Sequence, residues 1–314
     1  MSGVFVAGHR GLVGSAISRA LRSKGIEPIE QSRSELDLLD QRQVDSFIQE
    51  HRPDVVFVAA AKVGGIHANN TYRWDFIYQN LVIEANLLGA ALKADVKRVI
   101  FLGSTCIYPR ESPQPMKEEY LLTGPLEPTN EPYAVAKIAG VKLVDAANQQ
   151  HGRQWISLMP TNLYGPGDNF DLQNSHVIPA MIRKLHDAKL QRKRDEKASA
   201  TLWGTGSALR EFLHVDDLAS AALHAMERPE TGLYNVGTGE EVSVRELAQE
   251  IASTVGYDGP VSWDKTKPDG TPRKLVDSTR FRATGWSPTI SLREGLSKTY
   301  EWFLAQRPGD LRQL

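Results

Sequence analysis

The chain has 314 residues, of which 41% are hydrophobic, so it is long enough to bury a sizeable core in one large or two unequal domains. Its 37 basic and 38 acidic residues give a formal net charge of −1, which argues against general binding to nucleic acid or to acidic membranes. No apolar run approaches the roughly 20 residues of a membrane-spanning helix and no cationic leader precedes one, so we expect a cytoplasmic protein. The single cysteine, Cys106, cannot form an internal disulfide and has no metal-ligand spacing around it, so we expect no metal.

The first informative stretch is GHRGLVG, from Gly8 to Gly14. It follows an apolar run at residues 4–7 and precedes helical spacing at residues 15–21, which predicts a turn from a strand into a helix. Its glycines allow a tight turn and close approach to a pyrophosphate, and the helix N-terminus supplies free N–H groups. A glycine-rich turn also occurs in other α/β proteins, so the motif needs further support.

A polar residue about twenty positions beyond such glycines contacts the adenosine ribose. A carboxylate there accepts a hydrogen bond from a 2′-hydroxyl, whereas an arginine pairs with a 2′-phosphate. Both types occur here, as Glu30 and Arg33. Arg33 together with Arg10 would form a clamp of two guanidinium groups, which favours NADP, although either arginine could also be a solvated surface residue.

Apolar runs alternate with helical segments over the next part of the chain. Residues 54–61 and 98–104 are nearly continuous apolar runs, which is typical of parallel strands buried on both faces, and residues 74–94 have helical spacing. This alternation predicts an α/β fold with a doubly wound parallel (Rossmann) sheet. Ligands of such sheets bind beyond the carboxyl ends of the strands, so Ser104 and the residues after it should line the cleft.

The segment YAVAK places Tyr133 and Lys137 four residues apart, on one face of a predicted helix. A tyrosine pKa of about 10 must shift by roughly three units, or about 4 kcal/mol, before the phenol exchanges its proton near neutrality. A neighbouring ammonium and a cationic nicotinamide could supply that stabilisation. Any helix can carry this pair by chance, so its meaning depends on context.

The strand and helix alternation breaks at a Gly/Pro-rich stretch, residues 165–167, and resumes near Phe212. We therefore predict a cofactor-binding domain of residues 1–165 plus about 212–240. Residues 166–211 and 241–314 are predicted to form a smaller, C-terminal substrate-binding domain. Residues 191–197 are predicted to be a solvated loop, and residues 264–274 a polar loop.

The stretches GHRGLVG, GSTCIYP, YAVAK, MPTNLYGPGDNF, NSHVIPA, REFLHVDD and KPDGTPRK together resemble the extended short-chain dehydrogenase/reductase family over nearly the whole chain. Cys106, two residues beyond Ser104, and the NSHVIP stretch are similar to a subgroup that acts on GDP-4-keto-deoxy sugars. The resemblance implies a bifunctional NADPH-dependent enzyme that converts GDP-4-keto-6-deoxy-D-mannose to GDP-L-fucose. The steps would be epimerisation at carbons 3 and 5, then hydride reduction of the 4-keto group.

The resemblance also implies residue roles. Ser104 would hold the ketone oxygen, Tyr133 would give it a proton, and Lys137 would bind the nicotinamide ribose and lower the tyrosine pKa. Cys106 and His176 would be the acid and base of the epimerase, because carbons 3 and 5 flank the carbonyl and inversion needs a proton removed on one face and delivered on the other. The alternatives are a small buried residue for Cys106 and a packing or capping residue for His176.

The family's ligand contacts carry over to two sets of residues. The NADP(H)-binding positions are Gly8, His9, Arg10, Gly11, Leu12, Val13, Gly14, Arg33, Asp37, Leu38, Leu102, Gly103, Ser104, Thr105, Lys137, Pro160, Thr161, Asn162, Leu163 and His176. The GDP-binding positions are Arg183, Lys184, Trp203, Arg210, Asp269 and Lys274, with Arg273 beside the last. Lys184 stands where an arginine is expected, and it offers a point charge in place of a bidentate fork.

Family members pair through two helices, here residues 74–94 and 133–150, so a homodimer with a four-helix bundle is expected. A dehydratase or a 4-epimerase with tightly held NAD is an alternative, but dehydratases of the family place an acidic pair where this chain has Thr105 and Cys106. A non-catalytic NADP-sensing protein is a second alternative, yet it need not keep Ser104, Tyr133 and Lys137 together.

Overall fold

The structure, a computed structural model, describes residues 3–172, 175–267 and 269–306. At its centre is a five-stranded parallel sheet in the order β1-β2-β3-β4-β8. These strands are β1 (Val4–Ala7), β2 (Val55–Val58), β3 (Arg98–Leu102), β4 (Ile156–Pro160) and β8 (Gly232–Val236). Every residue of β1 to β4 is buried, which explains why their sequences are apolar apart from Arg98 and Ser157. The predicted doubly wound α/β fold is confirmed.

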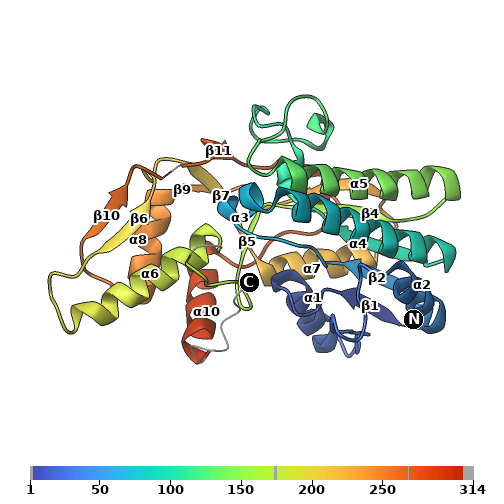
Figure 1. Ribbon diagram of the computed structural model, residues 1–314, viewed down its shortest axis with the longest axis horizontal. Helices are drawn as coiled ribbons and strands as arrows, with labels where there is room; N and C mark the ends of the chain where they lie inside the picture. Colours follow the sequence, from blue (N-terminus) through green and yellow to red (C-terminus); the bar gives the residue numbers. More distant parts are fainter. Residues whose placement is uncertain (1–2, 173–174, 268, 307–314) are drawn as a thin grey trace.

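Helices cover both faces of this sheet (Figure 1). The helices are α1 (Leu12–Ser23) and α7 (Val215–Met226) on one face, and α2 (Gln41–His51), α4 (Arg73–Lys93) and α5 (Glu131–His151) on the other. Alternate residues of each strand point to opposite faces, so Val6 packs with Ile17 of α1 while Phe5 packs against Phe47 of α2 at 4.9 Å between ring centroids. The sheet therefore has two hydrophobic cores, one on each side.

The chain reverses its direction of winding at β1. Ile29 bridges Phe5 on one side of β1, and β2 pairs with the other side. The loop after β1, which carries the glycine motif, therefore lies at the point where the strand order switches. Ligands of doubly wound sheets bind at this switch point, beyond the carboxyl ends of the strands.

The second half of the chain builds a separate core, at the left in Figure 1. Its elements are β5 (Asn162–Tyr164), α6 (Val177–Arg192), β6 (Ala200–Trp203), β7 (Leu209–His214), β9 (Glu241–Ser243), α8 (Val244–Val255), β10 (Val261–Asp264), β11 (Arg273–Lys274) and α10 (Leu292–Ala305). Strands β11, β7 and β5 form one sheet, in which β9 also pairs with β7, and β6 pairs with β10. Apolar residues of α6, α8 and α10, such as Leu185, Ile251 and Phe303, fill the core between them.

The chain crosses between the two cores several times. Phe212 of β7 belongs to the second core, but Leu213 and all of α7 pack under the central sheet, and β8 extends that sheet beside β4. Near the end, Phe281 of the short helix α9 (Thr279–Arg282) and Trp286 return to the core under the sheet. Two other short helices, α3 (Ile66–Thr71) and the turn η1 (Thr105–Ile107), lie beyond β2 and β3, and η2 (Glu118–Tyr120) lies in the loop before α5.

Two findings concern what the described residues lack. Within residues 3–172, 175–267 and 269–306, no helix combines the length and the hydropathy that crossing a membrane requires. The same residues contain no group of three or more His, Cys, Asp or Glu side chains placed to hold a metal ion.

Candidate functional site

The glycine loop between β1 and α1 forms a cradle that only glycine can line. Gly8 has φ +87°, and a Cβ there would lie 2.7 Å from the Ala60 backbone; a Cβ on Gly14 would lie 2.1 Å from the carbonyl oxygen of Gly8. The N-cap of α1 is Gly11, which offers no side-chain acceptor to the first N–H groups of the helix. The loop thus presents donors and partial positive charge with no side chain in the way, which fits the pyrophosphate of a dinucleotide.

At the predicted adenosine-ribose end, the carboxylate of Glu30 is already paired. Arg22 donates to it at 2.9 Å and also contacts Glu27 at 2.8 Å. Arg10 and Arg33 are exposed, and the partly buried Asp37 and Leu38 lie just before α2. Because Glu30 is engaged while both arginines face solvent, this end suits a 2′-phosphate better than a 2′-hydroxyl.

Ser104 and Cys106 lie on one turn at the carboxyl end of β3. Ser104 is the N-cap of η1, and its hydroxyl accepts a hydrogen bond from the Cys106 N–H at 3.4 Å. The Cys106 side chain is 8% exposed. Burial raises the pKa of its thiol, while Lys274, the Ser104 hydroxyl and Lys137 act in the opposite direction. The net effect raises the pKa, so the sulfur keeps its proton.

Tyr133 and Lys137 lie on the first two turns of α5, facing the same edge of the sheet. Burial raises the pKa of Tyr133 well above 10, and Cys106 and Glu84 raise it further. The expected lowering of this pKa by Lys137 is not the dominant effect here, so the phenol keeps its proton. The Lys137 ammonium lies 5.8 Å from the centre of the Tyr133 ring and donates to the Leu102 carbonyl at 3.1 Å.

His176 is the N-cap residue of α6, in the second half of the chain. Its side chain reaches solvent but is crowded by protein atoms, and this environment, together with Lys274, lowers its pKa. The imidazole is therefore uncharged at neutral pH. Lys274 acts on the pKa of both His176 and Cys106, so these two groups lie near one ammonium although they come from different cores.

A small cavity of about 40 Å³ lies beside Cys106. Its lining includes Thr105 and Cys106 from η1, Lys274 from β11 and Asn130, the N-cap of α5. It also includes Arg110, Gln114 and Glu127, from a loop in which sequence reasoning singled out no residue. That loop carries no motif, so the only signal for it was its position after Ser104.

The residues expected to bind GDP lie around the second core. Trp203, at the end of β6, is 47% exposed, with the ammonium of Lys184 at 4.8 Å and that of Lys267 at 5.5 Å from its ring centre. Lys267 was not predicted; its only signal is the basic composition of the loop after β10. Arg183 instead pairs with Asp187, one turn along α6, at 2.9 Å.

Arg210, on β7, and Asp269 also lie together. The Arg210 guanidinium donates to the Asp269 carbonyl at 3.1 Å, and the Asp269 carboxylate accepts from both the N–H and the hydroxyl of Thr205. Arg273 pairs with Glu241 at 2.8 Å. The remaining predicted positions, Leu102 to Thr105 and Pro160 to Leu163, follow β3 and β4 at the carboxyl edge of the sheet.

A parallel sheet with a glycine cradle at its switch point, and with Ser104, Tyr133 and Lys137 along its carboxyl edge, defines a dinucleotide-binding protein of the Rossmann type. The chain belongs to the NAD dependent epimerase/dehydratase family, which it matches over residues 4–237.

Individual relatives are similar to nearly the whole chain. GDP-L-fucose synthase of Escherichia coli (strain K12) is 55% identical over 312 residues, covering 96% of each chain. GDP-L-fucose synthase 1 of Arabidopsis thaliana is 54% identical, covering 96% of this chain and 93% of the relative. A solved structure of a GDP-D-glycero-L-gluco-heptose synthase from Campylobacter jejuni in the presence of NADPH superimposes with a TM-score of 0.89 at 33% identity, covering 97% of this chain and 99% of that one.

Proposed function

We propose that this protein is an NADPH-dependent epimerase-reductase that converts GDP-4-keto-6-deoxy-D-mannose to GDP-L-fucose. Relatives named GDP-L-fucose synthase at 55% and 54% identity support the activity. The observation that carries the proposal is that the residues of the two reactions lie close together. Ser104 caps the turn that holds Cys106, and Cys106 affects the pKa of Tyr133. A proton donor for a reduced ketone and a proton-exchanging thiol therefore face one small region. The enzyme is both an oxidoreductase and an isomerase, and we place it in the cytoplasm.

In the reduction step, Ser104 holds the ketone oxygen of the sugar and Tyr133 delivers the proton. The high pKa of Tyr133 supports this role, because the phenol carries the proton that it must give up. The ammonium of Lys137 binds the nicotinamide ribose and stabilises the tyrosinate left after transfer.

In the epimerisation step, Cys106 and His176 exchange protons with carbons 3 and 5. Burial keeps the thiol protonated, and the crowding of His176 by protein atoms together with Lys274 keeps the imidazole uncharged, so the pair contains one donor and one acceptor before substrate binds. Inversion requires one group on each face of the sugar, because a single group would return the proton to the face it came from.

The glycine cradle and the exposed arginines fit NADPH. When bound, the cofactor supplies the hydride that reduces the 4-keto group. The cradle holds the pyrophosphate, while Arg10 and Arg33 bind the 2′-phosphate and Asp37 and Leu38 border the adenine. The other predicted cofactor positions include His9, in the glycine loop near Glu30, and Gly103 and the stretch from Pro160 to Leu163, at the carboxyl edge of the sheet.

The GDP moiety binds along the second core. Trp203 stacks on the base, and the ammonium groups of the half-buried Lys184 and the exposed Lys267 attract the diphosphate or the base plane. Arg210, Asp269 and Lys274 lie between this face and Cys106. We further propose the predicted division into a cofactor domain of residues 1–165 plus about 212–240 and a substrate domain of residues 166–211 and 241–314, with Phe281 and Trp286 packed against the first.

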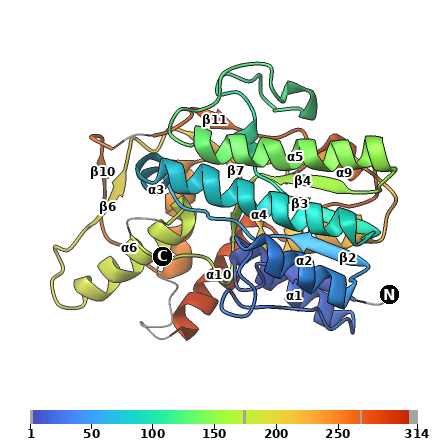
Figure 2. The same cartoon turned by 45° about the vertical axis from the view of Figure 1, so that its right-hand side comes forward.

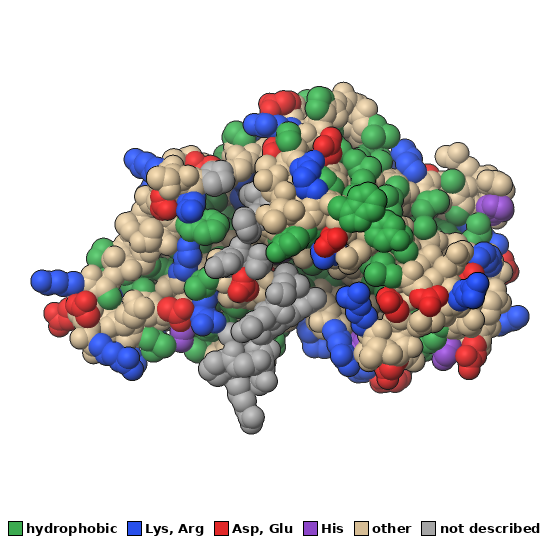
Figure 3. Space-filling view, viewed as in Figure 1, with side chains coloured by type: hydrophobic (Ala, Val, Ile, Leu, Met, Phe, Trp, Pro, Cys, Tyr) green, Lys and Arg blue, Asp and Glu red, His purple; other side chains and the backbone are tan. Residues whose placement is uncertain are grey.

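We also propose that the protein is a homodimer that pairs through α4 and α5. Large apolar side chains gather over these two helices (Figure 3), including Trp74 at 73%, Tyr78 at 51%, Leu143 at 42% and Val135 at 38% exposure. Trp74 and Tyr78 stack on one another at 5.6 Å. Such an apolar face on adjacent helices, seen side by side in Figure 2, suits a second copy of the same helices.

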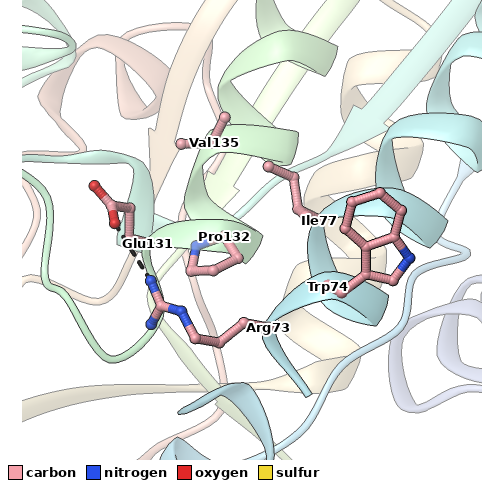
Figure 4. Close-up of a pocket in the computed structure, with 6 residues that line it drawn as sticks. All are labelled: Arg73, Trp74, Ile77, Glu131, Pro132 and Val135. Carbon is pink, nitrogen blue, oxygen red and sulfur yellow. Dashed lines mark hydrogen bonds and ion pairs between the residues drawn. The ribbon is translucent and has the colours of Figure 1, made fainter. Parts of the chain in front are cut away.

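A pocket of about 360 Å³ opens between the first turns of the two helices. Arg73, Trp74 and Ile77 of α4 face Glu131, Pro132 and Val135 of α5 across it, with Arg73 reaching towards Glu131 (Figure 4). This pocket could receive an apolar side chain of the partner. Trp74→Glu should convert the dimer to a monomer in sedimentation, whereas Leu190→Glu, an exposed leucine on α6, should not. A wild-type monomer at micromolar concentration would contradict the proposal.

The activity is tested by incubating the protein with GDP-4-keto-6-deoxy-D-mannose and NADPH and identifying the product by NMR. The proposal expects GDP-L-fucose, inverted at carbons 3 and 5. A reduced sugar without inversion would reassign the protein as a simple ketoreductase, and oxidation of NADPH only with a different GDP-keto-deoxy sugar would reassign the substrate.

A further inference from the structure

A buried ion pair joins α4 to α5 behind the carboxyl edge of the sheet. The Glu84 carboxylate of α4 lies 3.0 Å from the Lys137 ammonium of α5, and their side chains are 1% and 2% exposed. The ammonium also donates to the Leu102 carbonyl at 3.1 Å and lies 4.8 Å from the centre of the Phe101 ring. Glu84 is thus the acidic group that contacts Lys137, and water does not screen the pair.

The opposite helix makes room for this carboxylate. Gly140 lies in the interior of α5, where glycine is unfavourable for a helix. A Cβ there would lie 2.6 Å from Glu84 Oε2 and 2.3 Å from the Phe101 ring. The close packing of α4 and α5 at this point therefore depends on the glycine. This arrangement indicates that the position of the carboxylate is built into the fold.

We propose that Glu84 is a positioning residue for the reduction: its carboxylate holds the Lys137 ammonium in place and keeps it protonated. The inference rests on the proposed function, in which Lys137 binds the nicotinamide ribose and stabilises the tyrosinate of Tyr133. A lysine this deeply buried loses its charge readily unless an opposite charge compensates for the lost hydration. Glu84 provides that charge at 3.0 Å.

The other ionisable groups around the pair come from three elements. Tyr133 lies on α5 itself, and Cys106 lies on η1. Lys274 of β11 and Cys106 affect one another's pKa. Burial raises the pKa of Glu84, and the Lys137 ammonium counteracts this effect. Neither Tyr133 nor Cys106 is ionised in the ligand-free site, so Glu84 is the group that balances the charge on Lys137.

The test compares the pH dependence of kcat for NADPH oxidation in wild type, Glu84→Gln and Glu84→Asp. Without the carboxylate no opposite charge compensates the buried ammonium for its lost hydration, so the alkaline limb should move to lower pH, with activity recovering in acid. Glu84→Asp keeps the charge and should restore most of the wild-type profile. The control is Glu118→Gln, which changes another buried carboxylate that does not contact Lys137. Equal loss at every pH in Glu84→Gln would overturn the proposal, because a structural role would act in that way.

A second readout does not depend on activity. Lys137→Met leaves the Glu84 carboxylate buried without its cation, so its Tm should fall more than that of the double variant Glu84→Gln/Lys137→Met. Additive losses would show that the two groups do not stabilise one another and would overturn the inference. Failure of the wild-type enzyme to turn over the GDP-keto sugar would contradict the proposed function instead, and the Tm cycle would still test the ion pair.

Discussion

The ammonium of Lys137 and the ammonium groups beside Trp203 lie in opposite surroundings. Lys137 is 2% exposed, contacts Glu84 at 3.0 Å and is fixed by the Leu102 carbonyl. Lys184 and Lys267 lie over a half-exposed indole at 4.8 and 5.5 Å. The charge on Lys137 is surrounded by protein, whereas Lys184 is only half-buried and Lys267 is exposed to water and ions.

This difference predicts how strongly single substitutions in each region should affect catalysis or nucleotide binding. Charges in a dry environment interact strongly, are little affected by salt and leave a large penalty when one partner is removed. Exposed charges are screened over about 8 Å at physiological ionic strength and contribute individually small amounts. We therefore expect the chemistry to depend steeply on a few buried groups near Lys137, and nucleotide binding to depend shallowly on several exposed ones.

The largest effect is expected at the buried end. Tyr133→Phe removes the proton donor, so kcat for NADPH oxidation should fall by about 10²- to 10⁴-fold. The bound keto sugar should still exchange its carbon 3 and carbon 5 protons with deuterated solvent, because Cys106 and His176 remain. The control is Tyr257→Phe, whose hydroxyl bonds Ala200 and Pro260 in the second core. A Tyr133→Phe enzyme with near wild-type kcat would show that the buried phenol is not the donor.

A smaller effect is expected for an exposed residue that meets a full phosphate charge. Arg33→Ala should raise the KM for NADPH by about 10- to 100-fold, since a hydrogen bond to a charged group contributes about 1.5–3 kcal/mol, and should leave the KM for NADH nearly unchanged. Arg194→Ala, in the charged stretch after α6, serves as the matched control. Equal losses for both cofactors would mean that Arg33 does not touch the 2′-phosphate.

The smallest effect is expected beside Trp203. Lys267→Ala should raise the KM for the GDP sugar by about two- to fivefold, in line with an exposed cation–π contact of about 0.5–1 kcal/mol, and added salt should reduce the difference. Lys265→Ala, two residues away in the same loop, should have no effect. If Lys267→Ala raised the KM for the GDP sugar by a larger factor than Arg33→Ala raises the KM for NADPH, and salt did not reduce the effect, the predicted difference between the two regions would be wrong.

The sequence predicts the cofactor half well because its signals are local. Residues 54–61 and 98–104 became β2 and β3, since a parallel strand covered on both faces must be apolar throughout. The glycine motif fixed the turn at the switch point for the same kind of reason: Gly8 and Gly14 have no room for a Cβ. The short piece at Ile29 forms a single bridge to Phe5.

The remaining features depend on contacts between distant segments. Residues 264–274 were predicted as a polar loop, but Arg273 and Lys274 form β11 because they pair with β7 far earlier in the chain. The predicted solvated loop at 191–197 begins inside α6, which continues to Arg192. Glu84 had no motif to mark it, and its meaning appears only when α5 brings Lys137 against it.

The central claim is that reduction and epimerisation use different residues around one ketone. Turning over GDP-4-keto-6-deoxy-D-mannose and NADPH with Cys106→Ser in deuterated water, and analysing the product by NMR, tests it most directly. A serine hydroxyl is a much weaker acid than a thiol, so we predict that deuterium incorporation at carbons 3 and 5 falls sharply while Tyr133 still supports reduction, giving an uninverted deoxy sugar. A fully inverted, deuterated GDP-L-fucose formed at the wild-type rate would contradict the account and leave Cys106 as a packing residue.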